Sequence, residues 1–290
     1  MLEVSHSSCS MARSCPMKYK LRYVDGYKPI RKSTALTLGE VLHLAFDKYY
    51  TGMSDSDVAK FIVDTMDEYI ANASLTEREG FEVMKATLSG MWHFYPNKSL
   101  SQFSEIVSEK EFKIPFGDTM FVGKSDRLLK YQGKWWVGEL KTTGLPLQAF
   151  KNRMSVSDQV TAYVYAWQQQ GYDVQGVIFD YVKKPLLRKS AKDNCSDYCQ
   201  RIFKDYGVNQ NMYFGRHFEY RSAGDVERWV KDTSKVVDTI KGIWNGSYYR
   251  NTDSCFNYNA ECPYKKICFT DKPDPLTLQL YFEEQNVHKE

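Results

Sequence analysis

The chain has 290 residues, of which 42% are hydrophobic and 26% charged, and its formal net charge is +3. These values are those of a globular protein that can bury one sizeable core, arranged as one large domain or two small ones. A charge of +3 excludes nucleic-acid binding through overall charge, so any such binding must rest on a local basic patch.

Two further features bound the class of protein. No apolar run approaches the roughly 20 residues of a membrane span, and the N-terminal sequence lacks the apolar region of a secretory signal. The seven cysteines are an odd number, which disfavours a disulfide framework and favours metal or cluster binding. We therefore expect a cytoplasmic protein that does not interact with a membrane.

The N-terminal third is predicted to be helical. A helix is expected from Ser5 to Tyr23, and Pro16 predicts a break near Ser14–Cys15 because proline cannot continue a helix. Apolar residues at helical spacing predict three more helices, at 36–50, 54–72 and 74–94. His43 lies inside the first of these three, and a lone helical histidine is more often a core or surface residue than a ligand.

The middle of the chain is predicted to form strands at 103–116, 120–131 and 134–141. A turn at Gln132–Gly133 joins the last two strands into a hairpin. Asp126 lies on one strand of this hairpin, and Glu139 and Lys141 lie on the other. Residues two apart in a strand share a face, so Glu139 and Lys141 point the same way while Leu140 points into the core.

This hairpin can supply a metal site. Two carboxylates and a backbone carbonyl form a hard oxygen site suited to Mg²⁺ or Mn²⁺. Lys141 beside them could orient or deprotonate a water, or neutralise charge that develops on a phosphate. Taken singly, an Asp–Arg or Glu-x-Lys pair is more often a surface ion pair than part of a site.

Beyond the hairpin, a Gly- and Pro-bearing loop is predicted to lead to a helix at about 155–170. Gln159 and Tyr163 are four residues apart in this helix and share one face. A strand is expected at 174–182. The polar, basic segment at 183–205 that follows is either a loop or insertion that contacts DNA phosphates or a solvated charge run. Another strand at 213–221 and a long helix at 223–246 follow.

Three cysteines, Cys255, Cys262 and Cys268, follow that helix closely. Such a group predicts metal binding with a fourth ligand from elsewhere in the chain, and spacing alone leaves both zinc and an iron–sulfur cluster open. Cys195 and Cys199 lie in the polar segment and are interpreted as spare thiols.

Together these motifs resemble the iron–sulfur RecB-like nucleases of the PD-(D/E)xK superfamily, a group that includes CRISPR-associated and AddAB-type nuclease domains. Gly123 with Asp126-Arg127 matches the GxxDR form of the RecB-like branch, and Glu139-Leu140-Lys141 matches its ExK motif. The other matching features are the QxxxY pair Gln159 and Tyr163, the helical Gly39-x-x-x-His43, and the CPxxYxLxY opening at Cys15.

The resemblance implies an α/β fold with a mixed central sheet of the restriction-endonuclease-like core, flanked by helices. It also implies a helical N-terminal lobe and an iron–sulfur-bound C-terminal segment. We expect one nuclease domain over 1–290, with these parts: an N-terminal cluster-ligand segment at 1–35, a helical lobe at 36–100, the nuclease core at 101–221, and a C-terminal helix and cluster segment at 222–290.

The resemblance also implies roles for individual residues. His43, Asp126, Glu139 and the Leu140 carbonyl would hold Mg²⁺ or Mn²⁺, and the predicted catalytic residues are Asp126, Glu139, Lys141, Gln159 and Tyr163. A 4Fe-4S cluster would be bound by Cys15, Cys255, Cys262 and Cys268, with Cys9 as the alternative to Cys15.

The implied function is a Mg- or Mn-dependent deoxyribonuclease, an exonuclease on single-stranded or free DNA ends with possible endonuclease activity. Such an enzyme would serve DNA repair, recombination, or phage or CRISPR DNA processing in a bacterial or phage-infected cell, with protein partners in a larger complex. Two alternatives stay open: a catalytically idle nucleic-acid-binding subunit, and a zinc-stabilised DNA-binding protein.

Overall fold

The computed structural model describes residues 1–30, 34–257, 260–270 and 272–284. Its described residues divide into two compact units. One, which we call the terminal unit, lies within Met1–Ser33, Phe112–Gly123 and Ala223–Glu290. The other, the sheet unit, lies within Thr34–Glu111 and Lys124–Ser222. The predicted single domain with four segments stays a prediction.

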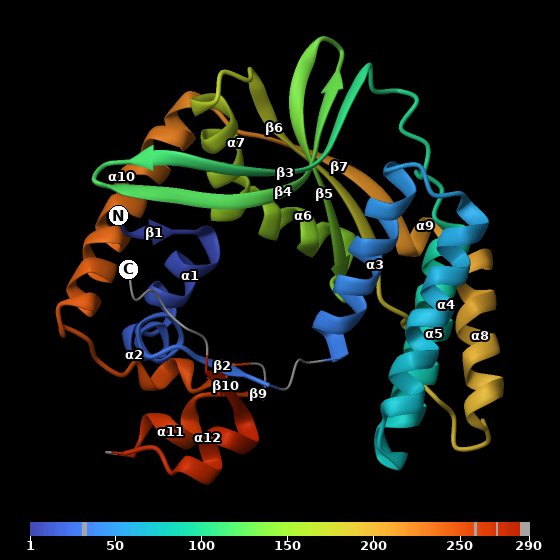
Figure 1. Ribbon diagram of the computed structural model, residues 1–290. Helices are drawn as coiled ribbons and strands as arrows, with labels where there is room; N and C mark the ends of the chain where they lie inside the picture. The colour runs from blue at the N-terminus through green and yellow to red at the C-terminus, as the bar shows by residue number, and fades with distance from the viewer. Residues whose placement is uncertain (31–33, 258–259, 271, 285–290) are drawn as a thin grey trace. The chain divides into compact units, whose positions relative to one another are not determined.

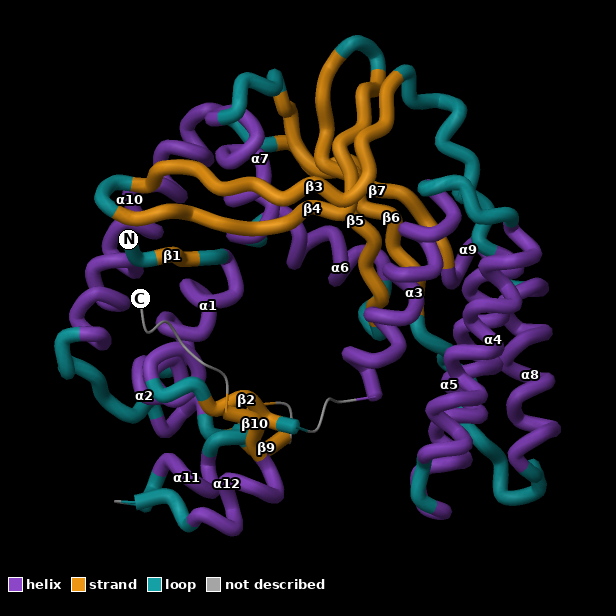
Figure 2. Tube along the Cα trace, in the orientation of Figure 1, coloured by secondary structure: helices purple, strands orange, loops and turns teal. Residues whose placement is uncertain are grey.

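A mixed β-sheet carries the strands of the predicted core (Figures 1 and 2). The strand order is β1-β4-β5-β6-β7, and β3 pairs with β4. The β5–β6 and β1–β4 pairs are parallel, whereas β4–β5 and β6–β7 are antiparallel. The bounds are Glu3–Val4 for β1, Glu105–Phe116 for β3, Thr119–Tyr131 for β4, Lys134–Thr143 for β5, Val174–Lys183 for β6 and Phe214–Tyr220 for β7. The predicted α/β fold with a mixed sheet is confirmed.

The turn between β4 and β5 fixes the register of the hairpin. Gln132 and Gly133 both have positive φ, at 50° and 75°, as a two-residue turn matched to the twist of the strands requires. The resulting register places Arg127 opposite Gly138. Asp126 is therefore brought to the same level as Glu139 on the neighbouring strand.

Four helices of the sheet unit form a layer with a shared apolar core. They are α3 (Thr34–Tyr50), α4 (Asp55–Asn72), α5 (Leu75–Phe94) and α8 (Cys195–Val208), and α5 packs beside both α4 and α8 (Figure 1). Side chains of this layer such as Leu42 and Leu88 pack with Leu140 of β5 and Val182 of β6. The first three helices match the predicted ones. Ser54 caps α4, and Ser74 with Glu77 forms a capping box on α5, as serine before an apolar periodic segment predicts.

The sequence patterns missed two longer helices of the sheet unit, and they also missed the four-residue α9 (Gln210–Tyr213). The segment after β5 was predicted as a loop, but α6 (Leu147–Ser155) begins directly after Pro146, which occupies the N-cap. Proline at a helix start is well tolerated, so it marked the beginning of a helix rather than its absence. The segment 183–205 was expected to be a loop or insertion. Its second half instead forms most of α8, a helix that buries Ile202 and Tyr206. The sheet unit also contains α7 (Asp158–Gln169).

The terminal unit is built from short elements around α10 (Ala223–Trp244). The predicted N-terminal helix breaks at Cys15, as expected, into α1 (His6–Ser14) and α2 (Pro16–Tyr19). Leu21, which follows α2, forms an apolar cluster with Tyr264, Ile267 and Phe282 from the other end of the chain. The other elements of the terminal unit are η1 (Lys20–Val24), β2 (Tyr27–Pro29), η2 (Thr252–Ser254), β8 (Phe256–Asn257), β9 (Ala260–Glu261), α11 (Lys265–Cys268), α12 (Pro275–Tyr281) and β10 (Phe282–Glu284).

Within the described parts of the chain, no helix is both long and apolar enough to cross a bilayer.

Candidate active site

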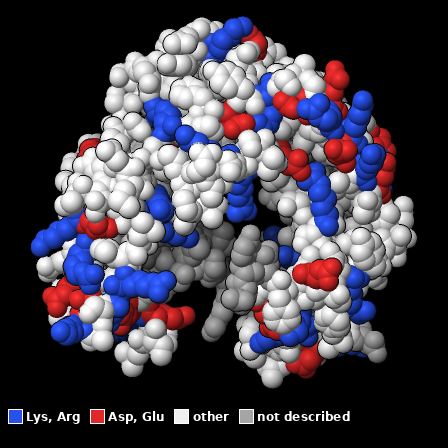
Figure 3. Space-filling view, turned by 180° about the vertical axis from the view of Figure 1, so that it is seen from behind, with Lys and Arg blue, Asp and Glu red and all other residues white. Residues whose placement is uncertain are grey.

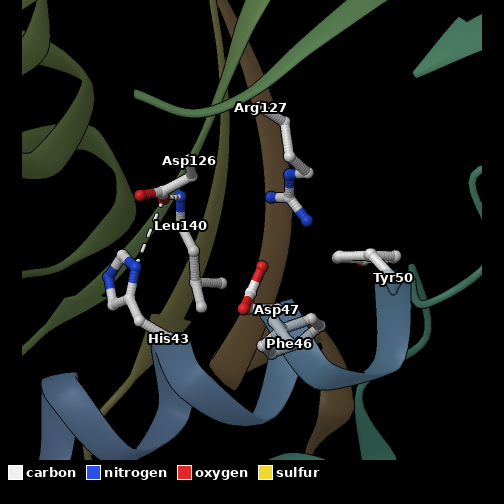
Figure 4. Close-up of a pocket in the computed structure, with 7 residues that line it drawn as sticks. All are labelled: His43, Phe46, Asp47, Tyr50, Asp126, Arg127 and Leu140. Carbon is white, nitrogen blue, oxygen red and sulfur yellow. Dashed lines mark hydrogen bonds and ion pairs between the residues drawn. The ribbon is translucent and has the colours of Figure 1, made fainter. Parts of the chain in front are cut away.

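Asp126 lies at the junction of three elements of the sheet unit. Its Oδ2 accepts a hydrogen bond of 2.9 Å from the backbone N–H of Leu140 on β5, and it lies 3.3 Å from Nδ1 of His43 on α3. Figure 4 shows His43 directed from α3 toward this carboxylate. The helical histidine and the strand aspartate, which the resemblance assigns to one metal site, are therefore brought together.

Glu139 and Lys141 form a second group on the same face of β5. Lys141 Nζ lies 2.7 Å from Glu139 Oε1 and donates to Gln159 Oε1 at 3.1 Å. Gln159 Nε2 in turn donates to the Tyr163 hydroxyl at 2.8 Å. The Glu139 side chain is only 4% exposed, and its Oε2 has no hydrogen-bond partner within the described part of the chain.

The electrostatics show that the two groups affect each other. Burial raises the pKa of Glu139, and the nearby negative charge of Asp126 raises it further. For Asp126, burial opposes ionisation, but the hydrogen bond and charge of His43 lower its pKa overall. For His43 and Lys141, burial works to lower the pKa, and the adjacent carboxylates raise it above the ordinary value. Two carboxylates are thus held close together, with the His43 imidazole beside Asp126 and the Lys141 ammonium beside Glu139.

The donor set suits a hard divalent cation, although it is not arranged as a preformed cage. Among the described residues, no three His, Cys, Asp or Glu side chains converge closely enough to hold a metal ion. One oxygen of each carboxylate is instead taken by a neighbouring side chain: His43 lies beside Asp126, and Lys141 lies beside Glu139. The unpartnered Glu139 Oε2, the Asp126 carboxylate and the His43 imidazole are the groups that could turn to such an ion.

The sequence was compared with models of known protein families. The family described as the PD-(D/E)XK nuclease superfamily matches residues 3–269. The chain belongs to this superfamily. The family supports a nuclease as its function, and such nucleases typically use divalent metals.

One solved structure agrees with this PD-(D/E)XK nuclease at the level of the fold. A protein from Eubacterium rectale named "Putative exonuclease" aligns with a TM-score of 0.53 at 11% identity, over 94% of this chain and 90% of that chain. The structure of SSO0001 aligns with a TM-score of 0.27 at 11% identity, over 82% of this chain and 97% of that chain, which is too weak to support an argument. A search of curated proteins found no match.

The motif glycine of the nuclease has a packing role. A Cβ on Gly123 would lie 2.3 Å from Cζ of Phe112, which is far inside van der Waals contact. The aromatic ring on β3 therefore lies directly against the backbone of β4. Any larger residue at Gly123 would displace this ring or the strand that leads to Asp126.

A pocket beside Asp126 contains residues that the motifs did not indicate. It is lined by His43, Asp126 and Leu140, together with Phe46, Asp47, Tyr50 and Arg127. Figure 4 shows Asp47 and Tyr50 rising from α3 on the same side as His43. Residues four and seven after a helical histidine share its face. That periodicity was the signal in the sequence that could have found Asp47 and Tyr50.

Behind this pocket is a buried ion cluster. Asp180 of β6 accepts hydrogen bonds from Arg216 Nε at 2.7 Å and Nη2 at 2.9 Å, and its Oδ2 lies 3.8 Å from Arg127 Nη2. The Arg127 guanidinium lies over the Tyr50 ring at 4.6 Å, and burial raises the pKa of Tyr50 to about 12. One carboxylate therefore partners two largely buried guanidinium groups, and one of these belongs to Arg127, the residue directly after Asp126 on β4.

Replacing Asp180 by asparagine is expected to lower the free energy of unfolding by about 3–5 kcal/mol, because two buried guanidinium groups would lose their counterion. Urea unfolding followed by tryptophan fluorescence would measure this loss. The matched control is Asp173→Asn, because Asp173 forms an exposed ion pair with Lys134 and should cost less than about 1 kcal/mol. Equal free energies of unfolding for the two variants would contradict the expected contribution of the ion cluster to stability.

The terminal unit brings four of the predicted cysteine ligands around one cavity. Its lining includes Cys15, Cys255, Cys262 and Cys268. Ser14 O accepts hydrogen bonds from Asn251 Nδ2 at 2.8 Å and from Ser254 Oγ at 2.7 Å. The two ends of the chain that carry these cysteines are therefore joined by direct contacts.

The remaining cysteines lie apart from this cavity. Cys9, the predicted alternative to Cys15, is buried in α1 and is not among the lining residues. Cys195 and Cys199 lie one helical turn apart on α8, with their Sγ atoms 4.0 Å apart.

The face drawn in Figure 3 carries both positively and negatively charged side chains. Lys and Arg side chains are interspersed there with Asp and Glu. This pattern agrees with the small net charge of +3. Binding to a polyanion on that face would therefore depend on individual cations rather than on a broad positive potential.

Proposed function

We propose that this PD-(D/E)XK nuclease is a metal-dependent deoxyribonuclease, with exonuclease action on single-stranded ends. The observation that carries the proposal is the convergence of Asp126 and Glu139 beside Lys141, with one oxygen of Glu139 buried and unpartnered within the described part of the chain. A buried carboxylate oxygen without a partner is costly, and a bound cation would remove that cost.

The metal would be Mg²⁺ or Mn²⁺, held by Asp126, Glu139, His43 and the Leu140 carbonyl. It would supply Lewis-acid polarisation of the scissile phosphate and acidify an attacking water. The two carboxylates and the carbonyl fit this role because oxygen ligands suit such ions, and His43 is the histidine that the family resemblance assigns to the metal.

The other residues of the site would orient the reactants. Lys141 extends its ammonium from Glu139 toward Gln159, so it can hold the water or stabilise charge that develops on the phosphate. Gln159 bonds both Lys141 and Tyr163. This connection would keep the ammonium in one place and leave the Tyr163 hydroxyl near the bound phosphate backbone.

The exonuclease assignment and its setting are parts of the proposal. The resemblance to RecB-like nucleases and the name of the Eubacterium rectale neighbour support exonuclease action. A role in DNA repair, recombination or phage or CRISPR DNA processing, in the cytoplasm and with protein partners, would suit such an enzyme.

The test is cleavage of end-labelled single- and double-stranded DNA with Mg²⁺, Mn²⁺ or EDTA. We expect shortening of single-stranded DNA from an end with either metal and none with EDTA. A circular single strand should be cut much more slowly than a linear one. Absence of cleavage under every metal condition would favour an idle nucleic-acid-binding subunit instead.

We propose further that the cysteine cavity holds a 4Fe-4S cluster. Three cations, Lys18, Arg250 and Lys265, line this cavity, and its described lining contains no carboxylate. A cluster bound by four thiolates is anionic, so this environment suits it. Four thiolates can also hold one zinc ion, so the identity of the metal has to be measured. Iron analysis and the absorption spectrum of the purified protein would distinguish the cluster from zinc.

A further inference from the structure

Arg221, which directly follows β7, connects to both sides of Gln159. Its Nε donates to Thr161 Oγ1 at 2.9 Å, and its Nη2 donates to Met154 O at 2.9 Å and to Ser157 O at 3.4 Å. The side chain is only 5% exposed. One buried guanidinium thus bonds groups that precede and follow Gln159 in the chain.

These partners lie where the chain passes from α6 to α7, at a helix end that needs support. Ser157 is the N-cap of α7, but its side chain makes no capping hydrogen bond. Val156 beside it is 79% exposed, although Met154 before it and Val160 after it are buried. The first turn of a helix frays most easily when its cap is missing, and Gln159 lies in that turn.

The guanidinium is itself held from the other side. Arg221 Nη1 donates to Glu219 Oε1 at 2.7 Å and to Tyr220 O at 2.8 Å. The second oxygen of Glu219 lies 3.0 Å from His217 Nε2. Glu219 therefore neutralises the buried cation and fixes its plane against the end of β7.

We propose that Arg221, anchored by Glu219, is a positioning residue that fixes the first turn of α7 and so holds the Gln159 carboxamide on Lys141. The proposal rests on the proposed nuclease function, because it concerns the residue that contacts Lys141 at 3.1 Å. Arginine suits this role because its planar fork directs five donors at once, whereas the single ammonium of lysine cannot reach partners on all three sides.

A double-mutant cycle with Arg221→Met and Gln159→Ala tests this proposal. In the wild-type background, Arg221→Met should lower kcat about 10- to 100-fold, as expected for misplacement of a group in the site, with less than about twofold change in KM. Arg221→Lys should restore little of this loss. In the Gln159→Ala background the same change should cost less than about twofold, because the positioned group is gone. Equal losses in both backgrounds would overturn the proposal.

Hydrogen exchange gives a readout that does not depend on activity. The amides of residues 161–163, which donate to the carbonyls of the first turn of α7, should exchange at least about tenfold faster in Arg221→Met or Arg221→Lys, while the amides toward the end of α7 keep their protection. The control is Arg201→Met, because Arg201 on α8 bonds Asp193 rather than α7. Unchanged exchange at 161–163 would overturn the proposal whether or not the protein cleaves DNA. Absence of cleavage by the wild-type protein would count against the nuclease function alone.

Discussion

Replacement of Lys141 by alanine is expected to lower the rate of DNA cleavage by about 10³-fold, which is the effect of removing one donor aimed at developing charge. The ammonium lies 2.7 Å from Glu139 and 3.1 Å from Gln159. Its removal therefore takes a hydrogen-bond donor and a positive charge away from both side chains. Affinity for single-stranded DNA should stay within about twofold of the wild-type value. Single-turnover cleavage and fluorescence anisotropy on the same labelled oligonucleotide would measure the two effects.

The matched control for this variant is Lys130→Ala on the same hairpin. Lys130 on β4 forms an ion pair of 2.5 Å with Glu105, so its removal also takes a cation and an ion pair from a strand. We expect nearly wild-type cleavage from this control. Cleavage retained in Lys141→Ala, or lost equally in both variants, would exclude the proposed role of Lys141.

The hairpin shows what the sequence could predict. The Gln132–Gly133 turn and the two-residue periodicity of the strands determined the register, and that register alone brings Asp126 to the level of Glu139. His43 and the Gln159–Tyr163 pair could be expected from helical spacing once a family resemblance gave each motif a place. The site was therefore predictable where its geometry is local or follows from a hairpin.

Other parts of the site depend on contacts that no local pattern records. Asp180 and Arg216 meet because β6 and β7 pair in one register, although 36 residues separate them. Arg221 reaches α7 for the same reason. The cations of the cysteine cavity, Lys18, Arg250 and Lys265, come from both ends of the chain, so their shared environment could not be inferred from spacing.

The second large effect is expected from Cys262→Ser. If four thiolates bind a 4Fe-4S cluster, this change should remove most of the iron and visible absorbance, and it should reduce the yield of folded protein. The physical reason is the length of chain between Cys15 and Cys255. A cluster that joins them restricts the unfolded state strongly because it closes a loop spanning most of the chain.

The matched control for the cluster is Cys199→Ser on α8, because Cys199 contacts Cys195 and lies outside the cysteine cavity. This control should keep its iron and its melting temperature. Phosphodiester hydrolysis transfers no electron, so the remaining soluble fraction of Cys262→Ser should still cleave DNA in proportion to its folded content. A Cys262→Ser protein that is as stable and as iron-rich as the wild type would show that the cavity holds no cluster. A stable variant that loses a single zinc ion instead would identify the site as a zinc site whose four ligands move together on binding.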